Sequence, residues 1–147
     1  MIGKVLVAGL VLAGVATTAI AQNDPIAQRK ATMKGVGDIW FGDINKMMKG
    51  EMPYNQATAV LVLEKIQAAG KAMVPLFPDN SKTGGDTKVL PTIWETKADF
   101  DGRWTRMANE ATAALASVKD EASFKVAQPN IAKNCQECHS TYRQRNN

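Results

Sequence analysis

Two cysteines and the one histidine of the chain lie together near the carboxyl terminus, in the segment Cys135-Gln136-Glu137-Cys138-His139. Residues three and four positions apart share a helix face, so both thiols and the imidazole would project to one side. C-x-x-C-H is the spacing of covalent haem attachment, in which two thiols form thioethers with the haem and the imidazole binds its iron. We therefore predict one haem c, held by Cys135 and Cys138, with His139 as the proximal iron ligand.

Two other kinds of site share part of this pattern. A zinc site needs four ligands in most proteins, and this motif offers three. A thiol–disulfide redox motif lies at a helix start beside a strand, whereas this one lies near the end of the last predicted helix. A haem-free dithiol oxidoreductase remains a distant alternative.

The second axial position of the iron decides the function. His139 is the one histidine, and methionine is the usual partner of histidine in electron-transfer haems. At a rise of about 1.5 Å per residue, Met33 lies about 12 Å into the first predicted helix, at the end of the molecule where the last helix ends. Met73, at the end of the second predicted helix, is the runner-up. The other methionines after residue 21 are expected to lie too far away: Met47, Met48, Met52 and Met107.

Apolar residues recur at the three-to-four spacing of amphipathic helices in four stretches. These stretches are residues 24–49, 54–74, 93–118 and 121–143. Their short connections favour antiparallel neighbours, and a long loop, residues 75–92, separates the second from the third. The predicted fold is all-α, an antiparallel up-down-up-down four-helix bundle that encloses one covalently bound haem.

Four residues are expected to disturb these helices. Gly35, Gly37 and Gly42 weaken the first helix locally, by about 1 kcal/mol each relative to alanine. Pro129 lies inside the fourth stretch, where proline kinks or breaks a helix.

The first residues read as a signal peptide. Lys4 precedes an apolar run, residues 5–15, that is shorter than the roughly 20 residues needed to span a bilayer. The small-x-small sequence that follows predicts cleavage after Ala21. The domains are then a signal peptide, residues 1–21, and one mature domain, residues 22–147. We expect a periplasmic protein without stable membrane association after cleavage.

The charge of the chain excludes one class of partner. The formal charge of +4 becomes +3 once Lys4 is removed, and the basic residues are scattered rather than clustered in a run. This pattern does not predict nucleic-acid binding, but it suits docking to an acidic redox partner protein.

The mature sequence resembles the class II c-type cytochromes, which include the high-spin cytochromes c′ and the low-spin cytochromes c-556. The resemblance covers the whole mature chain and depends on several motifs in a fixed order. These are Arg29-x-x-x-Met33-Lys34, Phe77-Pro78, Pro91-Thr92-Ile93-Trp94 and the run from Cys135 to Arg143.

The resemblance adds residue roles. In low-spin members the methionine that matches Met33 binds iron, and the arginine that matches Arg29 lies near a haem propionate. Arg29 also shares a helix face with Met33, and an arginine in an apolar stripe needs an anion. Asp86 and Thr87 are expected near the haem edge and Arg143 near the proximal histidine.

The predicted function is a periplasmic monohaem electron-transfer protein with low-spin, His/Met-ligated iron. It is not an enzyme, because no substrate pocket or acid–base pair is evident. The alternative is a high-spin, five-coordinate cytochrome c′ that binds nitric oxide or carbon monoxide. Redox partner proteins are expected. Monomer and homodimer both stay open, and the face formed by the first two helices is the place to look for a dimer contact.

Overall fold

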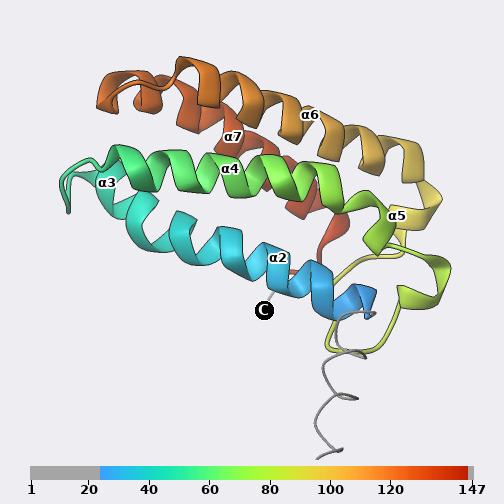
Figure 1. Ribbon diagram of the computed structural model, residues 1–147. Coiled ribbons are helices and arrows are strands. Elements are labelled where there is room, and N and C mark those ends of the chain that lie inside the picture. Colours follow the sequence, from blue (N-terminus) through green and yellow to red (C-terminus); the bar gives the residue numbers. More distant parts are fainter. Residues whose placement is uncertain (1–23, 146–147) are drawn as a thin grey trace, which may run out of the picture.

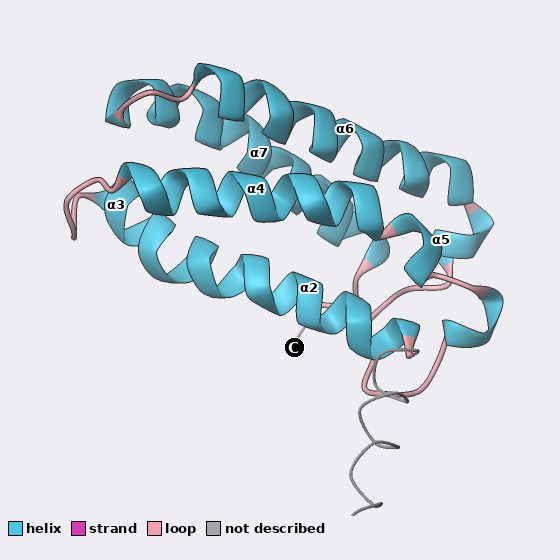
Figure 2. Cartoon of the chain, in the orientation of Figure 1, coloured by secondary structure: helices cyan, strands magenta, loops and turns pink. Residues whose placement is uncertain are grey.

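Four long helices lie side by side as antiparallel neighbours in the computed structural model, which describes residues 24–145 (Figure 1). The helical elements are α2 (Pro25–Ile39), the π-helix η1 (Trp40–Ile44), α3 (Asn45–Lys49), α4 (Gln56–Ala72), the 3₁₀ turns η2 (Val74–Leu76) and η3 (Asp79–Ser81), α5 (Thr92–Glu95), α6 (Lys97–Ser117) and α7 (Glu121–Tyr142). Loops join them at the two ends of the molecule (Figure 2). The predicted all-α, up-down-up-down bundle is confirmed. The proposed signal peptide lies outside the described residues.

The first predicted helix is present as α2, η1 and α3 in unbroken succession. Its start is capped by Asp24, whose Oδ1 accepts a hydrogen bond from the Ile26 N–H at 2.8 Å. It ends at Gly50, whose φ of 72° is in the left-handed region that glycine adopts without strain. The π-helix contains Gly42, so the local weakening expected from the glycines coincides with a change in helical pitch.

The second helix, α4, packs mainly against α6. Asn55 caps α4, because its Oδ1 accepts from the Thr58 N–H at 3.0 Å. At the crossing, a Cβ on Gly70 would lie 2.7 Å from Ala108 Cβ and 2.8 Å from Ala108 N. Glycine is therefore required for the close approach of these two backbones.

The third predicted helix is interrupted near its start. Residues Thr92–Glu95 form the separate short helix α5, and α6 begins at Lys97. At Thr96 the backbone leaves the helical region, with φ −124° and ψ 44°. The Thr96 hydroxyl lies 2.9 Å from the Tyr142 hydroxyl at the end of α7. This tertiary contact has no signature in helical periodicity, which explains why the interruption was not predicted.

The fourth helix, α7, is continuous through Pro129, so of the predicted kink or break the break is wrong. Its start is held by a capping box in which Asp120 Oδ1 accepts from the Ser123 N–H at 2.9 Å and Ser123 Oγ accepts from the Asp120 N–H at 3.0 Å. Proline removes one helical hydrogen bond. Phe124 before Pro129 and Ile131 after it are both buried in the core, so packing holds the helix on both sides of that position.

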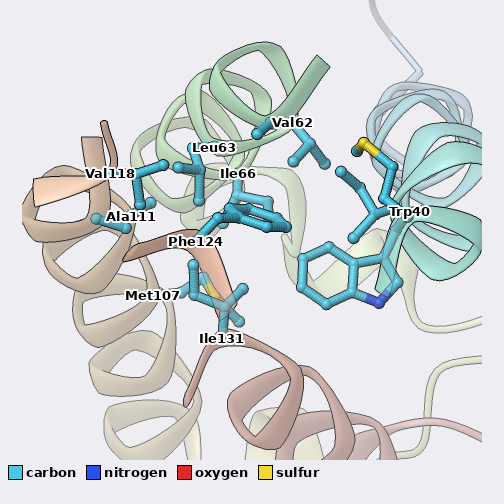
Figure 3. Close-up of a cluster of buried hydrophobic side chains, with 13 residues drawn as sticks. Trp40, Val62, Leu63, Ile66, Met107, Ala111, Val118, Phe124 and Ile131 are labelled. Atoms are coloured by element: carbon cyan, nitrogen blue, oxygen red, sulfur yellow. The ribbon is translucent and has the colours of Figure 1, made fainter. Parts of the chain in front are cut away.

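Two groups of buried apolar side chains fill the bundle. The larger group, here called the closed-end core, gathers between the helices around Phe124 (Figure 3). Its buried members are Trp40, Ile44, Met47, Ala59, Val62, Leu63, Ile66, Met107, Ala111, Ala114, Val118, Phe124 and Ile131. The smaller group, the cavity-end cluster, consists of Ala69, Met73, Phe77, Ile93, Phe100 and Tyr142.

Candidate haem site

A cavity of about 1000 Å³ opens beside the cavity-end cluster. Its wall includes Cys135, Cys138 and His139, so the three side chains of the C-x-x-C-H motif share one space, as the helical spacing predicts. They lie in the last two turns of α7. A cavity of this size is at the upper end of those that hold small-molecule ligands and cofactors.

Both thiols lie in surroundings that favour the neutral form. Burial, and then the neighbouring Cys138, raises the pKa of Cys135 to about 11. Burial also raises the pKa of Cys138, although the Arg103 guanidinium opposes this shift. A redox dithiol needs a thiolate with a lowered pKa, usually at the start of a helix. These thiols lie near the end of one, and their shifts weigh against the dithiol alternative.

His139 lines the cavity and keeps part of its surface exposed to solvent. Partial burial, and then the positive charge of Arg143 four residues later, lowers the pKa of His139 below its ordinary value. Both causes keep the imidazole neutral near pH 7, and neutral imidazole is the form that binds a metal. Arg143 therefore lies close enough to His139 for its charge to act on the imidazole.

Three methionines contribute to the cavity wall: Met33 from α2, Met73 from the end of α4, and Met107 from α6. The sequence led us to expect Met33 and Met73 near the iron, and both reach the cavity. Met107 also reaches it, although helix length led us to set it aside. Met73 is 1% exposed and Met107 is 8% exposed, whereas Met33 is half-buried.

Arg29 is 3% exposed and is bound to the loop that follows α4. Its Nη1 donates to Leu76 O at 3.0 Å and Ser81 Oγ at 2.9 Å. Its Nη2 donates to Ser81 O at 2.7 Å and Thr87 Oγ1 at 2.8 Å. The guanidinium also lies over the Phe77 ring, 4.6 Å from its centroid. Arg29 thus fixes the loop that forms one wall of the cavity, a role that the sequence did not reveal.

All of these Arg29 partners are neutral. Among the described residues no carboxylate lies within ion-pair distance of the guanidinium. A buried cation with no anionic partner is costly, and Arg29 lines the cavity. Burial lowers the pKa of Arg29, and the more distant Asp24 carboxylate only opposes this shift, so an anion bound in the cavity would stabilise the guanidinium further.

The long loop brings the other predicted residues to the cavity. Asp86 and Thr87 both line it, and Asp86 has a φ of 53°, in the left-handed region. The end of the chain pairs with the same loop, because Leu90 N donates to Tyr142 O and Gln144 N donates to Lys88 O. These bonds hold the residues after the motif against the cavity wall.

A polar network joins α6 to the last turns of α7. Tyr142 Oη donates to Asp99 Oδ2 at 2.6 Å, and Arg103 Nε donates to the same oxygen at 2.7 Å. Arg103 Nη1 also donates to Glu137 O, inside the motif, at 3.1 Å. Sequence reasoning missed this network, although the i, i+4 spacing of Asp99 and Arg103 gave half of the signal.

Trp104 provides a test of whether the cavity suits a haem. Its Nε1 is the one buried side-chain nitrogen or oxygen atom in residues 24–145 that has no hydrogen-bond partner. Trp104 also lines the cavity. Buried donors are nearly always paired, so an unpaired donor in a mostly apolar cavity is consistent with a large bound group that completes this wall. The donor set of two thiols and one imidazole is that of covalent haem.

Comparison with known proteins gives the family. The family model described as Cytochrome C' matches residues 24–143. The chain belongs to the cytochrome c′ family. It is 45% identical to cytochrome c′ of Rhodopseudomonas palustris over 93% of this chain and 92% of the relative. It is 33% identical to cytochrome c-556 of the same organism over 97% of each. The solved structure of R. palustris cytochrome c′ matches with a TM-score of 0.81 and 44% identity, over 86% of this chain and all of that one.

Membership of the cytochrome c′ family identifies the cofactor as covalently bound haem c, as predicted. The chain is a haem protein of this family, whose members are electron carriers or bind gases. The higher identity to cytochrome c′ than to cytochrome c-556 favours the high-spin alternative over the low-spin carrier that we expected from the sequence. No helix in the described part of the chain is long and apolar enough to cross a membrane.

Proposed function

We propose that this chain is a monohaem cytochrome in which Cys135 and Cys138 hold the haem covalently and His139 is the proximal iron ligand. The supporting observation is that these three side chains line one cavity of about 1000 Å³. When bound, haem supplies an iron that changes between ferrous and ferric states and can accept a further ligand. The chain itself orients the imidazole, encloses the ring in apolar side chains and places cations around it.

We further propose the five-coordinate form, in which His139 is the one protein ligand and the other face of the iron binds nitric oxide or carbon monoxide. The 45% identity to a protein named cytochrome c′ supports this form. Met73 and Met107 are packed within the two apolar clusters, which is the ordinary role of methionine as a filler of irregular space.

A second candidate is the low-spin electron carrier with Met33 as the other axial ligand. One observation favours it: Met33 lines the cavity from α2 and, although it packs against the cavity-end cluster, it is only half-buried. Met73 remains the runner-up for this ligand position.

Absorption spectra of the wild-type protein and of Met33→Ala separate the two forms. The five-coordinate form predicts broad high-spin bands that change on addition of carbon monoxide, with little difference between wild type and Met33→Ala. The low-spin form predicts sharp reduced bands in the wild type and conversion to a carbon-monoxide-binding form in Met33→Ala. Met73→Ala is the matched control. A mass equal to the bare polypeptide would contradict both forms.

Three further residue roles belong to the proposal. Arg29 offers its uncompensated charge to a haem propionate while its hydrogen bonds hold the loop. Asp86 lies at the haem edge, and Thr87 orients Arg29 through its hydroxyl. Arg143 places a positive charge beside His139, which favours the reduced and less positive iron.

Export to the periplasm by cleavage of residues 1–21 is also part of the proposal, together with redox partner proteins and the absence of enzymatic turnover. The oligomeric state is a separate question. Phe41 and Leu61 are large exposed apolar side chains on the first two helices of the bundle, with exposed fractions of 73% and 45%. Sedimentation of the wild type and of Leu61→Ser, which is outside the cavity lining, would show whether this face forms a homodimer.

A further inference from the structure

Basic side chains surround the mouth of the haem cavity. Six exposed cations line it, and they come from α2, the long loop, α6 and the C-terminal segment. They are Lys30, Lys34, Lys88, Arg106, Arg143 and Arg145. The acidic residues in the lining are Asp86 and Glu137. Because four separate segments contribute, the exposed positive charge of the cavity lining, here called the mouth, is spread over several elements rather than following one helix.

Most of these cations lack a carboxylate partner. Lys34 is paired with Asp38 at 2.6 Å. No acidic side chain of the described residues lies within ion-pair distance of the other five cations. Glu137, in contrast, lies 3.8 Å from Lys133, outside the mouth, which offsets part of its negative charge.

The rest of the molecule has the opposite charge balance. The cavity lining contains eight basic and two acidic residues, whereas the remaining described residues contain nine basic and twelve acidic ones. The cavity lining is therefore strongly positive, whereas the remaining described residues together carry a small net negative charge. Such an uneven distribution produces a field that orients a charged partner before contact.

We propose that the mouth of the cavity is the docking surface for a partner protein with an acidic face. The proposal rests on the cavity being the haem site, but not on which sixth ligand the iron has. Phe41 lines the same cavity and is 73% exposed, so the lining offers an exposed apolar side chain as well as exposed cations. Protein interfaces typically combine apolar and polar contacts in this way. The absence of a basic run in the sequence argues against a polybasic membrane-binding segment.

The test compares two triple variants of the haem-loaded protein. In the mouth variant, Lys88→Glu, Arg106→Glu and Arg145→Glu reverse cations that have no ion-pair partner. In the matched control, Lys46→Glu, Lys65→Glu and Lys71→Glu reverse cations outside the cavity lining. Both sets change the net charge by the same amount. Lys30, Lys34 and Arg143 are kept because they contact the loop, Asp38 and the His139 surroundings.

The probe is poly-L-glutamate, added at low ionic strength to isotope-labelled protein and followed by amide chemical shifts. We expect shifts to concentrate around the mouth, at least tenfold weaker binding by the mouth variant and less than threefold weakening in the control. Equal weakening of both variants would show that only net charge matters and would overturn the proposal. Chemical-shift changes concentrated away from the mouth would also overturn it.

Tighter binding to phosphatidylglycerol vesicles than to poly-L-glutamate would assign the surface to a membrane instead. Absorption spectra of each variant show separately whether the haem site is intact, so failure of docking and failure of the haem assignment give different results.

Discussion

The two ends of the bundle differ in what completes them. Three members of the closed-end core, Trp40, Ile66 and Met107, also line the cavity. The rest of this core is filled by the chain itself, and Phe124, Ile44 and Leu63 are at most 1% exposed. The cavity end contains a smaller cluster, a cavity of about 1000 Å³ and the unpaired Trp104 Nε1. The comparison indicates a division of roles. The closed end specifies the fold, and the packing of the cavity end is completed by a large bound group.

The largest expected effect is on the closed end. Phe124→Ala removes a ring that is 1% exposed and contacts Tyr54, with ring centroids 5.9 Å apart. Truncation of a buried phenylalanine costs about 3–5 kcal/mol, and we expect this loss with or without haem. Chemical denaturation of both forms measures it. If the loss disappears in the haem-loaded form, the two ends are not independent. Val126→Ala, at a 77% exposed position of the same helix, is the control.

Arg29→Leu is expected to affect the cavity end. It removes four hydrogen bonds to the loop and leaves Leu76 O and the Ser81 groups without their donor. Hydrogen bonds from a charged donor contribute about 1.5–3 kcal/mol each. Part of this loss is offset because the variant no longer buries a positive charge. We expect a net loss of roughly 2–3 kcal/mol in the free energy of unfolding.

Lys30→Leu is the matched control for Arg29→Leu. Lys30 is next to Arg29 and also donates to the loop, but from an exposed position, to Gly85 O. Its loss should cost less than about 0.5 kcal/mol. Equal losses in the two variants would show that Arg29 does not anchor the loop.

Two glycines test how tightly the helices are packed away from the cavity. Gly70→Ala would place a Cβ within 3 Å of the Ala108 backbone. We expect overpacking to cost about 1–3 kcal/mol. Gly35→Ala meets no atom within 4 Å in a helix interior, so it should stabilise the protein by about 0.5–1 kcal/mol. Thermal unfolding of both variants measures the pair. A neutral Gly70→Ala would mean that α4 and α6 separate easily.

Haem removal tests the division between the two ends directly. In Cys135→Ser/Cys138→Ser, which cannot hold the haem covalently, we expect amide hydrogen exchange to accelerate by tenfold or more in the loop and in the last turns of α7. The closed-end core should change by less than threefold, because local openings at the two ends are independent. Uniform acceleration over the whole chain would contradict the comparison.

The sequence predicted most of the fold and the centre of the site. Periodicity located the long helices, Asp24 and Gly50 marked the bounds of the first, and the C-x-x-C-H spacing placed three side chains in one cavity. Two of the failures share a physical cause. The interruption at Thr96 and the loop contacts of Arg29 depend on partners tens of residues away, and periodicity carries no information about such contacts.

The smallest expected effect concerns two carboxylates, one at each end. Hydrogen bonds from Tyr142 and Arg103 hold the pKa of Asp99 below its ordinary value of 3.8. Hydrogen bonds from Ser123 do the same for Asp120 at the start of α7. A carboxyl group with a lowered folded-state pKa stabilises the protein at pH values above its ordinary pKa, and this stability is lost as the pH falls through the folded value. Both ends therefore contribute to resistance against acid.

Tyr142→Phe separates the two contributions. It keeps the ring beside Phe100 but removes one donor to Asp99, so the pKa of Asp99 should rise and acid unfolding should begin at a higher pH. Thr96→Val removes the hydroxyl of Thr96, the other partner of the Tyr142 hydroxyl. Because the Thr96 hydroxyl carries no charge, this variant should lower the stability of the protein equally at all pH values. Acid titrations followed by circular dichroism compare the variants. The acid midpoints are compared after correction for the stability of each variant at pH 7. If both variants then shift the midpoint equally, Asp99 does not contribute to acid resistance. The acid sensitivity of the cavity end would in that case have the same origin as that of the rest of the bundle.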